Sequence, residues 1–176
     1  LERVYKVDRQ FLPNGPFLFE LDGYYNFNCL SIAIINNLHH GSPRNSYLAE
    51  VILKKKDLPE KVLTTRFATM QASYKPNVLL LAIEYGKMEI VDEILDHPNL
   101  TEEGFATFCP ELCYLIARDD PNKFAQKILL HTKFTSQVLT NHGALTPPLV
   151  LAIEKNRQDI IDIIMSLDGL TAEVFT

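Results

Sequence analysis

A long internal repeat constrains the fold of this chain more than any other feature. Residues 77–105 read NVLLLAIEYGKMEIVDEILDHPNLTEEGF, and residues 147–175 read PPLVLAIEKNRQDIIDIIMSLDGLTAEVF. One shift in numbering (152 − 82 = 70) places Ala82 on Ala152 inside a shared Leu-Ala-Ile-Glu. The alignment needs no gap and continues through a Leu-Thr pair to the final Phe of both segments. A match of this length indicates a repeated structural unit.

A copy of the unit is expected halfway along that period, and residues 115–139 supply it. They read LIARDDPNKFAQKILLHTKFTSQVL. A shift in numbering of 124 − 90 = 34 brings their apolar positions onto those of residues 90–95. The first helix of this copy is ambiguous by one position. Either Ile116 or Ala117 can hold the place of Ala82.

A looser copy lies upstream, where Ile32-Ala33-Ile34 aligns with residues 81–83. Its second helix follows in SYLAEVILKKKDLPEKVL, after the segment LHHGSPRN. That connecting segment is longer than its counterpart by about six residues, and surface loops accept such insertions at a small entropic cost. The sequence therefore contains about four units.

Each unit has the pattern of two helices. In the clearest copy, residues 79–83 and 90–95 carry apolar stripes at helical spacing, and Gly86 separates them. The small side chain of Ala82 lets the second helix approach the first closely. Thr101 is a typical N-cap residue, so we expect a short helical turn to begin there. The same position is held in the other copies by Thr135 and Thr171.

These units resemble ankyrin repeats. The first helices read NCLSIA at 28–33, NVLLLA at 77–82 and PPLVLA at 147–152, against the family's Thr-Pro-Leu-His-x-Ala. Gly86 lies at the family's inter-helix turn, and residues 89–95, EIVDEIL, are close to its usual second helix. The Trp-containing tetratricopeptide pattern has no counterpart, because the chain contains no Trp.

The resemblance implies an all-α, ankyrin-like helical repeat solenoid of about four repeats. Their approximate bounds are 28–67, 77–105, 111–139 and 147–176. Residues 1–27 form an irregular N-terminal segment that either caps the first repeat or ends a preceding domain. The chain departs from the family in two ways: the Thr-Pro-Leu-His motif is degenerate in every copy, and Leu-Thr replaces the usual Gly-Ala-Asp.

Degenerate arrays of this style are similar to the ankyrin modules of bacterial effectors delivered into host cells, and of some viral host-range proteins. That resemblance implies a protein–protein interaction module that acts on a host protein in the host-cell cytosol. One alternative is the non-catalytic ankyrin part of a larger enzyme, whose active site lies outside this chain. Another is a purely structural spacer.

Composition narrows the classes of partner. The net charge is −5 and includes no long block of one sign, which gives no support for nucleic-acid binding. The only basic run, Lys54-Lys55-Lys56, is interpreted as a solvated helix end. Three cysteines, an odd number, argue against a disulfide framework and favour a reducing cytoplasm. No apolar run approaches the roughly 18 residues of a membrane span.

The sequence predicts no catalytic, metal or cofactor site in this chain, and we do not expect the chain itself to be an enzyme. Cys109 and Cys113 are spaced C-x-x-x-C without a matching His pair, so we interpret them as reduced cysteines near a helix start. The carboxylate pairs at 102–103 and 119–120 are interpreted as helix starts or turns, where negative charge is favourable. No glycine-rich phosphate loop is present.

Aromatic residues precede several of the first helices, at Tyr24, Tyr25, Phe27, Tyr74 and Phe108. In ankyrin arrays these segments form projecting fingers along the concave face, where aromatic side chains would anchor a partner. The alternative is that they pack between fingers and stiffen the array. We therefore predict that another protein binds fingers and first helices through Tyr24, Tyr25, Phe27, Tyr74, Lys75, Glu84, Tyr85, Arg118, Asp119, His142, Glu154 and Lys155.

The C-terminal unit has an unusually apolar second helix. Residues 159–165 read DIIDIIM, and Ile163 takes the place that Glu93 holds in the internal copy. Terminal repeats of a solenoid need a polar outer face. The chain also begins with Leu1 rather than Met. We therefore expect it to be a fragment that continues beyond Thr176, or to self-associate through its C-terminal repeat.

Overall fold

The computed structural model describes residues 30–31, 33–34, 43–67, 75–118, 120, 123–141 and 145–175. Every regular element in these ranges is an α-helix or a 3-10 helix, and none of the described residues forms a strand. The expected all-α class is confirmed at this level. The N-terminal segment at 1–27 lies outside the described residues.

The elements follow one another as short helices joined by tight turns. Residues 30–31 and 33–34 are helical and belong to the expected first helix of the first unit. The remaining elements, in chain order, are α2 (Pro43–Leu53), α3 (Glu60–Thr64), α4 (Val78–Glu84), α5 (Met88–Leu95), α6 (Glu102–Ala106), α7 (Cys109–Ala117), α8 (Phe124–Leu129), η2 (Ser136–Thr140), α9 (Pro148–Glu154), α10 (Gln158–Met165) and η3 (Ala172–Phe175).

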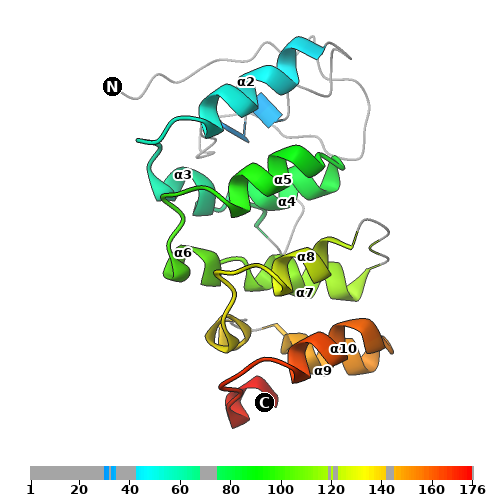
Figure 1. Ribbon diagram of the computed structural model, residues 1–176. Coiled ribbons are helices and arrows are strands. Elements are labelled where there is room, and N and C mark those ends of the chain that lie inside the picture. Colours follow the sequence, from blue (N-terminus) through cyan, green and yellow to red (C-terminus); the bar gives the residue numbers. More distant parts are fainter. Residues whose placement is uncertain are drawn as a thin grey trace.

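Figure 1 shows the helical pairs α4–α5, α7–α8 and α9–α10 stacked one below the other, with α2 above them. The short helices α3, α6, η2 and η3 form a further column along one side of the stack, and each contacts the next. The short turns predicted to follow Thr101, Thr135 and Thr171 are present as α6, η2 and η3. In the first unit the expected second helix is divided into α2 and α3, and Pro59 directly precedes α3. Each pair packs its apolar side chains against the pairs beside it, so the apolar core runs along the stack.

The backbone reproduces the long repeat in detail. Gly86 and its counterpart Asn156 both adopt left-handed backbone, with φ of 62° and 53°. The residue that follows each one donates its N–H to the carbonyl of Ala82 or Ala152 at 2.9 Å. Glycine and asparagine are the residues that accept this conformation at a helix C-terminus, so a change of residue type leaves the turn intact.

Burial settles the register of the middle copy. Ala82 and Ala152 are both fully buried, as expected for positions where two helices approach closely. In α7, Ile116 is buried and Ala117 is exposed. Ile116 therefore holds the place of Ala82 (116 − 82 = 34), the same shift that aligns the second helices of these two copies.

The threonine prediction holds for one copy and fails for another. Thr101 accepts a hydrogen bond from the backbone N–H of Gly104 at 3.0 Å and so caps α6. The Glu60 carboxylate of α3 in turn accepts from the backbone N–H and hydroxyl of Thr101, at 2.7 and 2.6 Å. Thr135 precedes η2 but makes no side-chain cap, so the prediction there was wrong.

Phe108 corrects the expectation of a projecting finger between the second and third units. Only Thr107 and Phe108 separate α6 from α7, and Phe108 is fully buried. Its ring packs edge-on against Phe105, with centroids 5.8 Å apart. The aromatic side chain that precedes α7 is therefore part of the core and cannot anchor a partner.

Two histidines connect successive units in the same way. His97 and His131 hold equivalent places in their units (131 − 97 = 34), and the Nδ1 atom of each accepts the backbone N–H of the residue two positions on, at 3.2 Å. With Nδ1 accepting, the other ring nitrogen, Nε2, is the donor. It donates to the Lys55 carbonyl at 3.3 Å in one unit and to the Asp96 carboxylate at 3.0 Å in the next.

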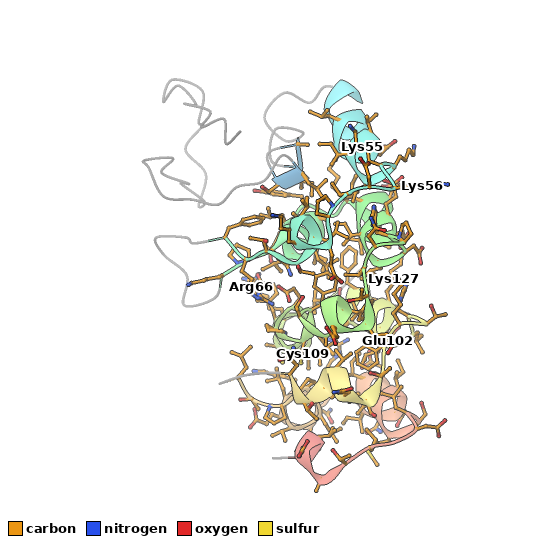
Figure 2. All side chains as sticks on the ribbon, turned by 90° about the vertical axis from the view of Figure 1, so that its left-hand side faces the viewer. Lys55, Lys56, Arg66, Glu102, Cys109 and Lys127 are labelled. Carbon is orange, nitrogen blue, oxygen red and sulfur yellow. The ribbon has the colours of Figure 1, made fainter. Side chains whose placement is uncertain are left out.

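Arg66 joins three parts of the stack. Its guanidinium donates to both carboxylate oxygens of the buried Glu111 in α7, at 2.9 and 2.8 Å. It also donates to the carbonyls of Thr107 and Lys75, at 2.7 and 2.8 Å. A forked, charge-assisted contact of this kind compensates the buried carboxylate. Figure 2 shows Arg66 on one side of the stack and Lys127 on the other.

Glu93 of α5 is poorly compensated. Its Oε2 atom is buried and has no hydrogen-bond partner among the described residues. Burial raises the pKa of the Glu93 carboxyl above its ordinary value; nearby Lys54 lowers it and Glu50 raises it further. Folding therefore favours the neutral form of this side chain.

We expect Ala82→Leu to lower the melting temperature while the chain stays helical at low temperature. Overpacking a buried site typically costs about 1–3 kcal/mol, and each kcal/mol shifts the midpoint of a chain of this size by about 2–4 °C. Ala117→Leu is the matched control, because Ala117 is exposed on a first helix. Circular dichroism melts measure both. Equal midpoints for the two variants would contradict the tight helix contact.

We also expect Glu93→Gln to be more stable than the unmodified chain at neutral pH. The native state holds the Glu93 proton more tightly than the unfolded state, so the free energy of unfolding falls as pH rises through the raised pKa. The advantage of the variant should disappear at acidic pH, where both states carry the proton. Thermal melts across this pH range test it, with the exposed Glu89→Gln as control. A pH-independent difference would contradict this assignment.

Candidate protein-interaction face

Polar side chains lie at the C-terminal ends of the three stacked first helices. Glu84 ends α4, Arg118 follows the last residue of α7, and Glu154 ends α9. Their spacings in the sequence (118 − 84 = 34 and 154 − 84 = 70) are those of the repeat, so they hold equivalent places. All three are exposed. We refer to this column, together with Tyr85 and Lys155, as the first-helix end face.

Within the first-helix end face, two predicted residues bind each other. The Arg118 guanidinium lies 3.2 Å from the Glu84 carboxylate, which connects the α4–α5 pair to the α7–α8 pair. The Tyr114 hydroxyl hydrogen-bonds both groups. The Arg118 guanidinium also lies over the Tyr114 ring, 4.7 Å from its centroid. Burial and then the contact with Glu84 raise the pKa of Tyr114 to about 12, so its hydroxyl stays protonated.

Tyr114 is a member of the site that the sequence analysis did not select. It lies in the last turns of α7, four positions before Arg118, which directly follows that helix. Residues at this spacing near a helix end can reach one another. That spacing was the available signal. The position lies inside the apolar run of α7, which gives no local sign that a side chain there reaches a polar surface.

Tyr85 has a mixed role. It is half-buried and packs against the core. Burial raises the pKa of its hydroxyl, and the neighbouring Glu84 raises it further. A partner can reach only part of this side chain, so the aromatic surface available at this face is smaller than the sequence suggested.

Lys155 and Lys75 are exposed, but they lie at opposite ends of their first helices. Lys155 directly follows Glu154 at the end of α9. Lys75 precedes α4 and so lies at the other end of that helix from Glu84. The backbone of Lys75 is anchored, because its carbonyl accepts a hydrogen bond from Arg66.

The remaining six predicted binding residues lie outside the described part of the chain. Every aromatic candidate except Tyr85 is among them. These residues are Tyr24, Tyr25, Phe27, Tyr74, Asp119 and His142.

The two cysteines of α7 are structural. Cys109 and Cys113 are free thiols, and both are buried. Their mutual hydrogen bond and then burial raise the pKa of Cys109 far above its ordinary value, which keeps it in the neutral form. Cys113 donates to the carbonyl of Thr146 at 3.6 Å. Burial denies both thiols the accessible surroundings of a nucleophile.

Within the described ranges, no group of three or more His, Cys, Asp or Glu side chains is placed to hold a metal ion. None of the helices described has the length and apolar character needed to cross a bilayer. The chemistry of the first-helix end face is that of non-covalent contacts: carboxylates, a guanidinium, an ammonium group and tyrosine hydroxyls on a helical frame.

Comparisons with known proteins add no further constraint. Family models, curated proteins and solved structures were compared with the chain, and no significant match was found in any of the three. A function for the chain can therefore be argued only from the residues and geometry described above.

Proposed function

We propose that this chain is an ankyrin-like repeat module that binds another protein through its first-helix end face and the segments that precede its first helices. The observation that carries the proposal is the column of exposed charged groups at equivalent positions of successive units. Glu84, Arg118 and Glu154 present alternating charges along the stack. An extended partner would meet a regular series of polar contacts on a frame whose spacing is fixed by core packing.

The charges of this face favour selectivity over raw affinity. Exposed ion pairs are worth about 0–1 kcal/mol each, because water and salt screen them. Complementary charges across an interface mainly set the association rate and exclude wrong partners. Affinity then depends on apolar anchors, and the half-buried rings of Tyr85 and Tyr114 are described residues of that kind at this face.

We further propose, on the resemblance stated for the sequence, that the module belongs to a secreted bacterial effector and meets its partner in the host-cell cytosol. The supporting feature is the sequence of the repeats. The helical pairs keep the apolar and turn positions of the family, while its Thr-Pro-Leu-His motif is degenerate. A binding surface in such an array is set by its exposed residues and not by the fold.

We expect the charge-reversing double variant Lys75→Glu, Lys155→Glu to lose a partner that the unmodified chain retains in affinity capture. Both side chains are exposed and neither ammonium makes a described intramolecular ion pair, so folding should be unaffected. The matched control is Glu89→Lys, which reverses an exposed charge on the second-helix side of the stack. Retention should be lost only in the double variant, with unchanged circular dichroism for all three proteins.

Once the partner is purified, an alanine scan of the predicted residues should place the largest losses on the aromatic positions. Hot spots typically cost more than about 2 kcal/mol when truncated. Tyr85→Phe belongs in the set, because it removes the hydroxyl and keeps the packed ring. Losses confined to the second-helix side, at positions such as Glu89, would contradict the assignment of the face.

A further inference from the structure

The α4–α5 pair reaches forward to the next pair through three carboxylates. Each accepts a contact from the unit that contains the α7–α8 pair. The contacts are Glu84 with Arg118 at 3.2 Å, Asp92 with Lys127, and Asp96 with His131 at 3.0 Å. We call the side of a unit that faces the next unit along the chain its forward side. In this internal unit the forward side carries carboxylate acceptors, which bind cationic groups or N–H donors of the next unit.

The α9–α10 pair repeats two of these three acceptors. Under the repeat shift (154 − 84 = 70), Glu154 takes the place of Glu84, and Asp162 takes the place of Asp92. Both are exposed. The Asp162 carboxylate accepts only a local hydrogen bond among the contacts described for it, from the Gln158 amide at 2.6 Å. The third acceptor is changed, because Ser166 holds the place of Asp96.

The apolar positions of the forward side are repeated as well, and they are uncovered. Ile83 is 7% exposed in the internal unit, whereas its counterpart Ile153 is 59% exposed. Val91 is fully buried, whereas its counterpart Ile161 is only partly buried. Leu95 is 1% exposed, whereas its counterpart Met165 is 53% exposed. Figure 1 shows the α9–α10 pair at the end of the described stack, with η3 at one side.

We propose that the forward side of the α9–α10 pair is a docking surface for a basic, amphipathic α-helical pair of a separate polypeptide. The contact between the α4–α5 and α7–α8 pairs specifies the chemistry of that partner. Its first helix presents a hydroxyl or guanidinium to Glu154, as Tyr114 and Arg118 do for Glu84. Its second helix presents an ammonium group to Asp162, as Lys127 does for Asp92.

Apolar side chains of the same partner cover Ile153 and Ile161. Burial of apolar surface is the main favourable term in association, so this part of the contact supplies affinity. The two carboxylates fix the direction and register of the helices, because unpaired or like charges at these points disfavour other alignments. This surface shares Glu154 with the first-helix end face. Its test is made at Asp162, which is not part of that face, so the two proposals can fail independently.

The probe is a synthetic peptide of this chain's residues 106–141, the segment that covers the equivalent side of the α4–α5 pair. Labelled peptide is titrated with the full chain and followed by fluorescence anisotropy. We expect saturable binding that weakens at least tenfold in Asp162→Lys. A peptide carrying Lys127→Asp should bind Asp162→Lys more tightly than it binds the unmodified chain, because the charge pair is restored in reverse.

Asp168→Lys is the matched control, since it reverses an exposed charge of the same unit outside the repeated acceptor positions. It should leave peptide binding unchanged, and circular dichroism should show that all variants are folded. The proposal is overturned if the peptide does not bind. Equal binding by Asp162→Lys and the unmodified chain also overturns it.

Light scattering of the full chain alone tests whether a second copy of the chain covers this surface. We expect a monomer at every concentration used in the titration. Concentration-dependent self-association that Ile153→Glu abolishes would show that a second copy covers this surface, and would overturn the assignment to a separate basic helical pair.

Discussion

Each helical pair in this chain buries its apolar stripes against the pair beside it, and the remaining features depend on that contact. In the α4–α5 and α9–α10 pairs, the first helix packs closely against the second at Ala82 and Ala152, which are fully buried. The left-handed residues Gly86 and Asn156 turn the chain so that the second helix returns along the first. Because α4, α7 and α9 stack in the register of the repeat, the exposed residues Glu84, Arg118 and Glu154 at their ends fall into a column. Core packing therefore sets the position of the residues in the candidate binding face.

Much of the helical frame could be predicted from the sequence, because short-range patterns encode it. The apolar stripes and Gly86 predicted the α4–α5 pair, and Thr101 predicted the start of α6. Phe108 could not be placed in the same way. A buried aromatic and an exposed one carry the same letter, and the connection between α6 and α7 proved too short to project.

The polar contacts between units were the least predictable part. Arg66 and Glu111 lie far apart in the sequence, and nothing in the local pattern relates them. Arg118 and Glu84 were both selected as exposed binding residues, yet they contact each other across two units. Exposed pairs of this kind contribute about 0–1 kcal/mol, against about 1.5–3 kcal/mol for one buried aliphatic side chain. They select the alignment of neighbouring units more than they hold the units together.

The contacts of Arg66 also bear on how the chain unfolds. In an array whose units touch only their neighbours, stability is nearly a sum of local terms, and the ends can open without the middle. Arg66 follows α3, yet it holds carbonyls on both sides of the α4–α5 pair and a buried carboxylate in α7. Opening any of these three units exposes a charge that the others compensate. The first three units should therefore open as one cooperative block, with amide protons that exchange together.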